Sequence, residues 1–439
     1  MPYRSEGSPV EQGSLKPKGY LPRIADSCIS RLLDEFGAVE VAGPMWCGKT
    51  WTSLSFASSV SRMGRQAERI LAQADPSVAL LGDQPHAIDE WQDVPAIWDE
   101  VRYQIDESGS KPGQFLLTGS SEPNKDQLRH SGAGRIATFR MGTMTFAEMG
   151  YSRGEVSLAN LFSNSFKPQL SHQTLASYAP LICRGGWPAL VGSRQSYTDF
   201  IANYLNALFS VSMTRRGMDE NRSHRVAQSL ARNLGQASKL TTIAEDAGIE
   251  AGNSTEASRV AAAYVSTLVH LYIIDEVTGW DAPIRSKSRL RIKPRRYFAD
   301  PSLAASLLGV TPDRLLMDGQ LFGMLFESLV MHDLRIYASA LPGATQDSLH
   351  YYRDSDGLEV DAILELSDGH WAGIEIKLGE NKVDDGISSL VRLRRKIALN
   401  PLARNPQPAF MAVVVGAGEA ARYDSENDVY VIPFACLGP

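Results

Sequence analysis

The chain has 439 residues, more than one hydrophobic core usually accommodates, so two or three domains are expected. Hydrophobic residues make up 43% of it but form no run long enough to cross a bilayer, which argues against a membrane partner. With 44 Lys and Arg against 50 Asp and Glu, the formal net charge of −6 excludes a surface coated for nucleic acid, so any such site must be local.

The N-terminal stretch 1–20 is polar and contains Gly, Pro and Ser, without the apolar core of a signal peptide. It is predicted to be a loose leader before a first helix over 24–36. Because the cysteines are scattered and lack metal-ligand spacing, we expect free thiols in a reducing cytoplasm. They are Cys28, Cys47, Cys183 and Cys436.

The segment from Val39 to Thr50 is a short β-branched strand followed by G-x-x-x-x-G-K-T, the phosphate-binding loop. Gly43 and Gly48 would let the loop backbone turn its N–H groups toward a pyrophosphate. Lys49 is expected to reach the β- and γ-phosphates, and the Thr50 hydroxyl to take one Mg²⁺ position. These features predict a site for ATP and Mg²⁺.

A helix over 50–60 would aim its positive N-terminal end at the same phosphates. The residues between the two glycines, Met45, Trp46 and Cys47, would contribute backbone N–H groups to the nucleotide. Cys47 is either an oxidisable thiol or a small neutral spacer, and the spacer is the preferred interpretation.

Two acids, Asp89 and Glu90, follow a short apolar run. Asp89 could hold Mg²⁺ through water, and Glu90 could polarise the water that attacks the γ-phosphate. A third apolar strand, 114–117, ends in the hydroxyls of Thr118 and Ser120. Because ligands of an open parallel sheet lie beyond the carboxyl ends of its strands, these side chains should meet Thr50 at one edge.

Residues 21–150 alternate strand and helix, the pattern of a parallel α/β sheet. Arg135, in a glycine-containing turn, could reach a γ-phosphate in its own or a neighbouring subunit, and the second case requires a homo-oligomer. A surface arginine in a loop is the alternative. The stretch 151–195 is Ser-rich with few periodic apolar positions, which predicts a linker or lid.

Three helices, expected over 225–234, 241–249 and 254–271, precede two strands, expected over 272–278 and 285–298. This order is the winged-helix plan, a variant of the helix-turn-helix, and it assigns 196–312 to a winged-helix domain.

Cations occupy every other position of the second of these strands. Alternate residues of a strand share a face, so the cations would form one stripe able to follow a DNA backbone. An edge strand protected against aggregation is the alternative. The stripe consists of Arg285, Lys287, Arg289, Arg291, Lys293 and Arg295.

The last third, 313–439, contains a hairpin in which Asp361 precedes Glu375 and Lys377. Glu375 and Lys377 are two apart on a strand and share a face, and Asp361 lies on the preceding antiparallel strand. Two carboxylates could hold Mg²⁺ while Lys377 stabilises or deprotonates the attacking water, as in a metal-dependent nuclease. Glu327, on the preceding helix, could add a ligand. A cross-strand salt bridge is the alternative.

Taken together, the loop at 43–50, Asp89 with Glu90, the strand end at 117–120 and the Gly-Arg at 134–135 resemble the prokaryotic AAA-type ATPases related to archaeal ATPases. In that family the module is fused to a C-terminal domain of unknown function. The later segments resemble this tail, which looks like a winged helix followed by a PD-(D/E)XK nuclease-like fold. The usual Arg-Gln-Val of the family's loop is replaced by Met45-Trp46-Cys47.

The resemblance implies an α/β chain with a P-loop AAA-type ATPase domain, a winged-helix domain and a restriction-endonuclease-like domain. One interpretation is an ATP-driven enzyme acting on DNA, in which ATP turnover gates a Mg²⁺-dependent nuclease. The other is a nucleotide-switched DNA-binding or regulatory protein, related to toxin–antitoxin or defence systems, whose nuclease-like domain does not cut. The sequence leaves both open.

Overall fold

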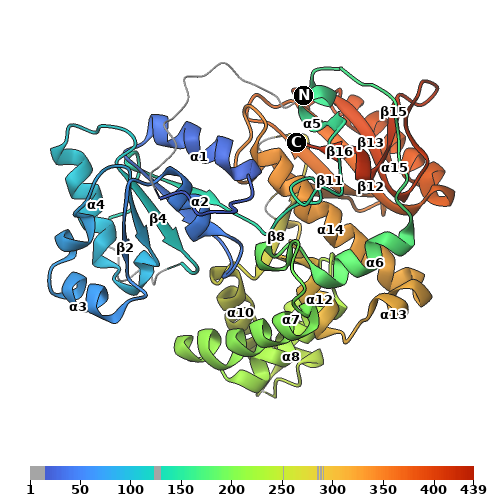
Figure 1. Cartoon of the computed structure of the whole chain (residues 1–439). Helices are drawn as coiled ribbons and strands as arrows, with labels where there is room; N and C mark the ends of the chain where they lie inside the picture. Colours follow the sequence, from blue (N-terminus) through green and yellow to red (C-terminus); the bar gives the residue numbers. More distant parts are fainter. Residues whose placement is uncertain (1–14, 123–129, 251, 284–285, 287–288, 290) are drawn as a thin grey trace. The chain divides into compact units, whose positions relative to one another are not determined.

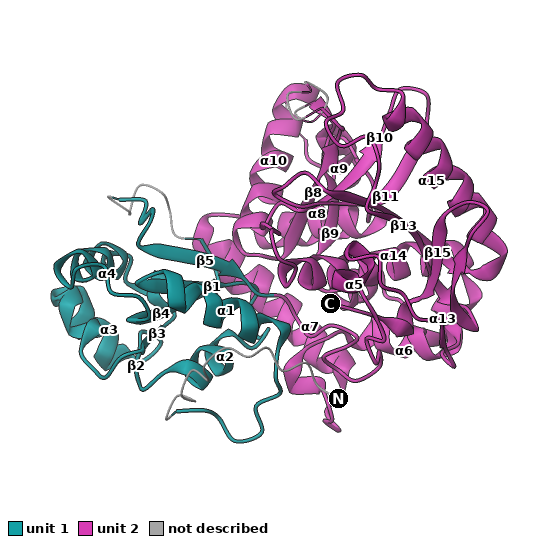
Figure 2. Cartoon of the chain, turned by 90° about the horizontal axis from the view of Figure 1, so that it is seen from above, with its two compact units in different colours: residues 1–141 teal, residues 142–439 magenta. Residues whose placement is uncertain are grey.

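The computed structural model describes residues 15–122, 130–250, 252–283, 286, 289 and 291–439. Most of the predicted leader lies outside these ranges. The chain forms two compact units, Met1–Met141 and Gly142–Pro439 (Figure 2). None of the described helices has the length and apolarity that crossing a membrane requires. All four cysteines are free thiols, as expected, and all four are buried.

The first unit is a five-stranded parallel sheet with helices on both faces (Figure 1). The strand order is β2-β3-β4-β1-β5, so β4 lies between the strand that leads into the phosphate loop and the strand that ends in Asp89. Its elements are α1 Ile24–Glu35, β1 Ala38–Ala42, α2 Lys49–Phe56, β2 Ser59–Arg62, α3 Gln66–Ala74, β3 His86–Asp89, α4 Ala96–Glu107, β4 Phe115–Gly119 and β5 Ile136–Arg140.

Alternating side chains of the central strands feed two cores. Val39 and Val41 pack with Ile29 of α1 on one face, whereas Ala38 packs with Val101 of α4 on the other. A strand of a parallel sheet is covered on both faces and is therefore apolar throughout, as β4 is. This three-layer arrangement confirms the parallel α/β sheet predicted for the first unit.

The second unit is built on a nine-stranded mixed sheet in the order β7-β14-β15-β13-β12-β11-β10-β8-β9. Its first half contains β6 Val156–Ser157, α5 Leu158–Phe162, β7 Gln169–Leu170, α6 Leu175–Arg184, α7 Tyr197–Ala207, α8 Glu220–Arg232, α9 Leu240–Asp246, α10 Ser254–His270, β8 Ile274–Trp280 and β9 Arg295–Phe298. Its second half contains α12 Pro301–Leu307, α13 Pro312–Met317, α14 Gly319–Ser339, β10 Leu349–Arg353, β11 Glu359–Glu365, β12 Trp371–Gly379, α15 Val383–Ala398, β13 Phe410–Ala417, β14 Ala420–Asp424, β15 Val429–Pro433 and β16 Leu437–Gly438.

The prediction of a linker or lid over 151–195 is wrong. Strand β7 pairs with β14 at the edge of the large sheet, and β6 pairs with β16 near the C-terminus. In α6, Tyr178 is buried and stacks on Phe146. These two-residue strands have no periodicity of their own, because their pairing partners lie about 250 or more residues later, so local pattern could not reveal them.

The order of three helices and an antiparallel strand pair is present as α8, α9, α10, β8 and β9. However, β8 also pairs in parallel with β10, so the strand pair is part of the nine-stranded sheet. Residues 142–439 form one compact unit, whereas the sequence predicts separate domains over 196–312 and 313–439. The winged helix itself stays a prediction.

Candidate functional site

The phosphate loop connects β1 to α2, and three of its residues have a positive φ angle. Gly43, Trp46 and Gly48 have φ of 155°, 66° and 108°. A Cβ added at Gly43 would lie 2.2 Å from the carbonyl oxygen of Met141, so no other residue fits there without movement of the backbone. Successive turns of this kind direct backbone N–H groups into one concavity, which suits an anion.

Two side chains hold this loop in shape from within. Lys49 is 4% exposed, and its Nζ donates a hydrogen bond of 2.8 Å to the carbonyl of Pro44. Arg23, also buried, donates from Nη1 to the carbonyl of Cys47 at 2.8 Å. Cys47 is fully buried beside Met141, which favours the spacer over the oxidisable thiol. Sequence reasoning missed Arg23, which lies one residue before the first helix and outside any motif.

Asp89 receives two hydroxyl hydrogen bonds at the end of β3. Oγ1 of Thr50 and Oγ1 of Thr118 each donate to Oδ1 of Asp89 at 2.7 Å. The three residues come from α2, β4 and β3, and they meet because β4 lies between β1 and β3. The predicted meeting of polar strand ends is therefore present.

Glu90 is held by a second set of neutral donors. Its backbone has φ of 58°, and its N–H donates to Oγ1 of Thr118 at 3.1 Å. Its Oε2 accepts from Oγ of Ser120 at 2.8 Å and from Nε2 of Gln92. Gln92 was missed from sequence, although it follows the acid pair by two residues. Neutral donors orient the carboxylate without removing its charge.

The donor set around Thr50 fits Mg²⁺. A hydroxyl and a carboxylate are the hard oxygen ligands that this ion prefers, and the site needs few of them because bound phosphates supply the rest. Thr50 and Asp89 are already within 2.7 Å of one another, and Lys49 lies next to Thr50 in the first turn of α2.

A buried acid, Glu40, contacts the residue that follows the acid pair, and the sequence analysis did not single it out. Glu40, in the middle of β1, accepts hydrogen bonds from Nε1 of Trp91 at 3.1 Å and Oγ1 of Thr138 at 2.9 Å. Burial raises the pKa of Glu40. Since Trp91 directly follows Glu90, this bond fixes the chain beyond the acid pair. In the sequence, Glu40 can be recognised as the charged residue inside an otherwise apolar strand.

Arg135 is not placed to reach a phosphate in its own subunit. It directly precedes β5, whose first residue Ile136 pairs with Ala38 at the start of β1, whereas the phosphate loop follows the other end of β1. Its Nε pairs with Oδ1 of Asp106 at 2.8 Å. Of the alternatives for Arg135, this placement argues against a phosphate contact within its own subunit, because the parallel register places Arg135 at the opposite end of the strands from the phosphate loop.

The second predicted site lies in the second unit, where β11 and β12 run antiparallel. Oδ2 of Asp361 accepts a hydrogen bond of 3.0 Å from the backbone N–H of Ile376. Nζ of Lys377 lies 3.7 Å from the same Oδ2 and donates to Oε2 of Glu375. The hairpin thus brings Asp361, Glu375 and Lys377 together as predicted.

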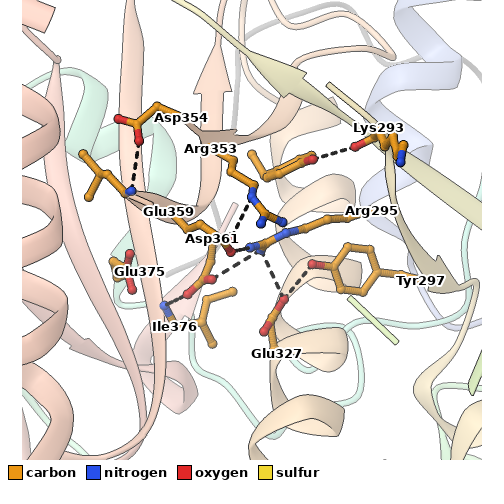
Figure 3. A network of polar contacts seen from close by, with 12 residues as sticks. Lys293, Arg295, Tyr297, Glu327, Arg353, Asp354, Glu359, Asp361, Glu375 and Ile376 are labelled. Carbon is orange, nitrogen blue, oxygen red and sulfur yellow. Dashed lines mark hydrogen bonds and ion pairs between the residues drawn. The ribbon is translucent and has the colours of Figure 1, made fainter. Parts of the chain in front are cut away.

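A second cation, Arg295 of β9, lies among the remaining carboxylates (Figure 3). It is 6% exposed, and its guanidinium lies 2.7 Å from Glu359, 3.4 Å from Asp361 and 3.6 Å from Glu327. We call these residues, with Glu375, Lys377 and Tyr297, the Arg295 cluster. In the described part of the chain, no three His, Cys, Asp or Glu side chains are arranged to hold a metal ion. The predicted metal site on Asp361, Glu375 and Glu327 is not formed, because cations lie between these acids.

Burial and the nearby charge of Asp361 make two acids of the Arg295 cluster, Glu327 and Glu375, reluctant to ionise. Burial, followed by the charge of Asp361, raises the pKa of Glu327 to about 7. The same two causes raise the pKa of Glu375 well above its usual value. Burial opposes the charge on Lys377, but Asp361 and Glu375 outweigh it and raise the pKa of the lysine.

The cationic stripe is not formed as predicted. Arg285 and Lys287 lie outside the described residues, and β9 begins only at Arg295. Arg289 and Arg291 are in helical conformation, where alternate residues do not share a face. Arg289 makes two contacts of 2.7 and 2.9 Å with Glu365, and Lys293 is exposed in a segment without regular structure. The alternation of cations along the sequence predicts a strand, but the chain is helical at Arg289 and Arg291 and irregular at Lys293.

Three family matches divide the chain. Residues 35–150 match the AAA domain family, 175–314 match a domain of unknown function (DUF8612), and 322–437 match another (DUF4143). Comparison with curated proteins finds no match.

Solved structures with a detectable likeness include the following three proteins. The Walker-type ATPase PABY2304 of Pyrococcus abyssi is 13% identical, with 68% of this chain and 99% of that chain covered and a TM-score of 0.42. A RuvB variant of Thermotoga maritima is 17% identical, with 60% and 94% covered and a TM-score of 0.29. The replication initiator DnaA, bound to AMPPCP and single-stranded DNA, is 11% identical, with 59% and 96% covered and a TM-score of 0.24.

TM-scores of this size indicate distant likeness. The assignment of the first unit comes from its own strand order and loop, together with the family match over 35–150. Residues 35–150 are therefore similar to the AAA domain family and contain a phosphate-binding loop, and the chain joins them to two segments similar to domains of unknown function.

Proposed function

We propose that the first unit binds ATP with Mg²⁺ and hydrolyses it. The observation that carries this proposal is the double hydrogen bond from Thr50 and Thr118 to Asp89, with Glu90 held beside it by Ser120. A hydroxyl from the loop, a metal-binding carboxylate and a charged general base are then oriented toward the same edge of the sheet.

Each residue has a distinct part in this proposal. Lys49 exchanges its bond to the carbonyl of Pro44 for the phosphates, since a buried ammonium needs a partner in either state. Glu90 orients water and withdraws a proton from it. Thr50 and Asp89 would hold Mg²⁺, which neutralises charge on the phosphates when bound. Ser120 and Gln92 keep the carboxylate of Glu90 in one orientation.

The test separates binding from turnover. Lys49→Ala should abolish binding of a fluorescent ATP analogue, because the phosphates lose their buried cation. Glu90→Gln should keep the affinity and lower the rate of phosphate release by about 100-fold or more, since the positioned base is lost. Equal nucleotide affinity in wild type and Lys49→Ala would contradict the proposal, as would unchanged turnover in Glu90→Gln.

For the second unit we propose the regulatory interpretation, in which ATP turnover switches a DNA-binding module and the nuclease-like part does not cut. The order of α8, α9, α10 and the β8–β9 pair supports a winged helix. The cations within the Arg295 cluster favour this interpretation over a metal-dependent nuclease. A cytoplasmic location and a homo-oligomer remain expectations from the sequence.

DNA binding is tested by fluorescence anisotropy of labelled duplexes over a series of salt concentrations. In a winged helix the third helix enters the major groove, and Arg259 is an exposed cation on α10. Arg259→Ala should weaken binding and lower the salt slope by about one. The exposed Arg65, in the first unit, is the matched control. Absence of binding in wild type at low salt would overturn the proposal.

A further inference from the structure

Arg295 has the coordination of a bound cation rather than that of a surface arginine. Three carboxylates from two elements converge on its guanidinium: Glu327 from α14, and Glu359 and Asp361 from β11. The aromatic ring of Tyr351 covers it, with the guanidinium carbon 4.6 Å from the ring centroid. A cation enclosed by acids and one aromatic face is already fully satisfied.

Each of these carboxylates already has at least one oxygen in contact with a hydrogen-bond donor or a cation. Oδ2 of Asp361 accepts from the N–H of Ile376, and Oδ1 faces Arg295. Oε1 of Glu327 accepts from the hydroxyl of Tyr297 at 2.7 Å. Glu375 accepts from Lys377. In Figure 3 the carboxylates of Glu327, Glu359 and Asp361 point toward the guanidinium of Arg295.

A divalent ion placed among these acids would meet two positive charges at short range. Arg295 cannot lose its proton in a protein, and its guanidinium lies 2.7 Å from Glu359 and 3.4 Å from Asp361, so it cannot become neutral to admit the ion among these acids. The residues present therefore do not fit the metal that a nuclease-like fold implies.

We propose that Arg295 occupies the position of a divalent cation in this carboxylate cluster, so that the cluster binds no metal and instead ties β9 to α14 and β11. This goes beyond the proposed function, because it assigns the acids of the nuclease-like part a mechanical role. The strand that follows the predicted DNA-binding helices is thereby fixed to the helix and sheet of the C-terminal part. Movement of one requires movement of the other.

The experiment measures Mn²⁺ binding by electron paramagnetic resonance on the full chain without nucleotide. All variants carry Asp89→Asn, which removes the carboxylate proposed to bind metal in the first unit. In this background, adding Asp361→Asn should change nothing. Adding Arg295→Met should create about one Mn²⁺ site per chain, and Asp361→Asn should then weaken that site by about 10- to 100-fold. Arg289→Met, which removes a half-buried arginine–glutamate contact elsewhere on the sheet, should create no site.

The outcomes are separable. If Asp361→Asn removes Mn²⁺ from the chain that keeps Arg295, the cluster is a metal site and the proposal is overturned. If Arg295→Met folds but gains no site, Arg295 does not stand in a metal's place, and the proposal is again overturned. If Arg295→Met does not fold, the effect of Asp361→Asn on Mn²⁺ binding by the chain that keeps Arg295 still tests the proposal. None of these results bears on ATP turnover, which the Lys49 and Glu90 variants test separately.

Discussion

Two groups of carboxylates lie on the two large sheets of this protein, one at the end of β3 and the other on the central strands β11 and β12, and they differ in what surrounds them. Asp89 and Glu90 accept hydrogen bonds from hydroxyls and an amide. Asp361 and Glu375 face the charged groups of Arg295 and Lys377. Both groups are held in place by several contacts, so rigidity does not distinguish them.

The two groups differ in the charge of the side chains that contact the acids. Neutral donors orient an acid and leave its negative charge available for Mg²⁺ or for a proton, whereas arginine and lysine neutralise it. A pair of acids near a lysine is therefore an ambiguous sign of metal chemistry. The first group is suited to catalysis, and the second to holding three elements together.

Removing the cation should have the largest effect on this comparison. Arg295→Ala leaves several acids without their partner, and we expect a loss of about 3–5 kcal/mol in the free energy of unfolding by urea. Arg289→Ala, a matched control with one carboxylate partner, should cost about 1 kcal/mol. Asp89→Ala should likewise cost about 1 kcal/mol, because its hydroxyl partners can turn to water. Equal losses in Arg295→Ala and Asp89→Ala would remove the contrast.

The pH dependence of stability should show the same contrast. The pKa of Glu327 is about 7 in the folded chain against an ordinary value of 4.5. Between these values the folded state keeps a proton that the unfolded state releases, so stability is full below about pH 4.5 and falls as pH rises toward 7. Glu327→Gln should reduce this slope by up to about 1.4 kcal/mol per pH unit. Glu375 acts in the same direction and remains in the variant. Urea unfolding of wild type and Glu327→Gln at pH 5, 6 and 7 measures how the free energy of unfolding changes with pH. The same slope in both proteins would contradict a raised pKa of Glu327.

Removing a neutral hydrogen-bond donor at the first site should lower the rate of ATP turnover more than it lowers the free energy of unfolding. Thr118→Val removes the donor to Asp89 and the acceptor for the N–H of Glu90, and we expect ATP turnover to fall by about tenfold with little change in KM. Thr138→Val is the control, since its hydroxyl donates to Glu40 on the same sheet but not to the acid pair. A tenfold loss in both variants would point to a general weakening of the sheet.

The smallest effect is expected from Arg135→Ala. Its ion pair with Asp106 is 43% exposed on the arginine side, so its loss should cost about 0.5 kcal/mol or less. The parallel register fixes it at the sheet edge away from the phosphate loop, and turnover should change less than about twofold. A sharp fall in turnover that depends on protein concentration would instead reveal an arginine acting on a neighbouring copy.

The sequence by itself determined the phosphate loop and its carboxylate partners. Gly43, Gly48, Lys49 and Thr50 act through backbone turns and a helix start that are local in the chain, and Asp89 is the last residue of its strand. The parallel α/β pattern then brings strand ends to one edge for any strand order. The pairing of Asp361 with Glu375 and Lys377 was also predictable, because a short hairpin fixes it.

Only the tertiary structure decided what neutralises those acids and where the arginines go. Arg295 reaches Asp361 across 66 residues of sequence, and it does so because β8 joins β9 to the sheet that contains β10 and β11. No local pattern specifies such a pairing, just as none places Arg135 at the far edge of its sheet or gives β7 its partner. Backbone geometry near a motif follows from nearby residues, but the charge around a buried acid depends on strands that meet only when the whole sheet has formed.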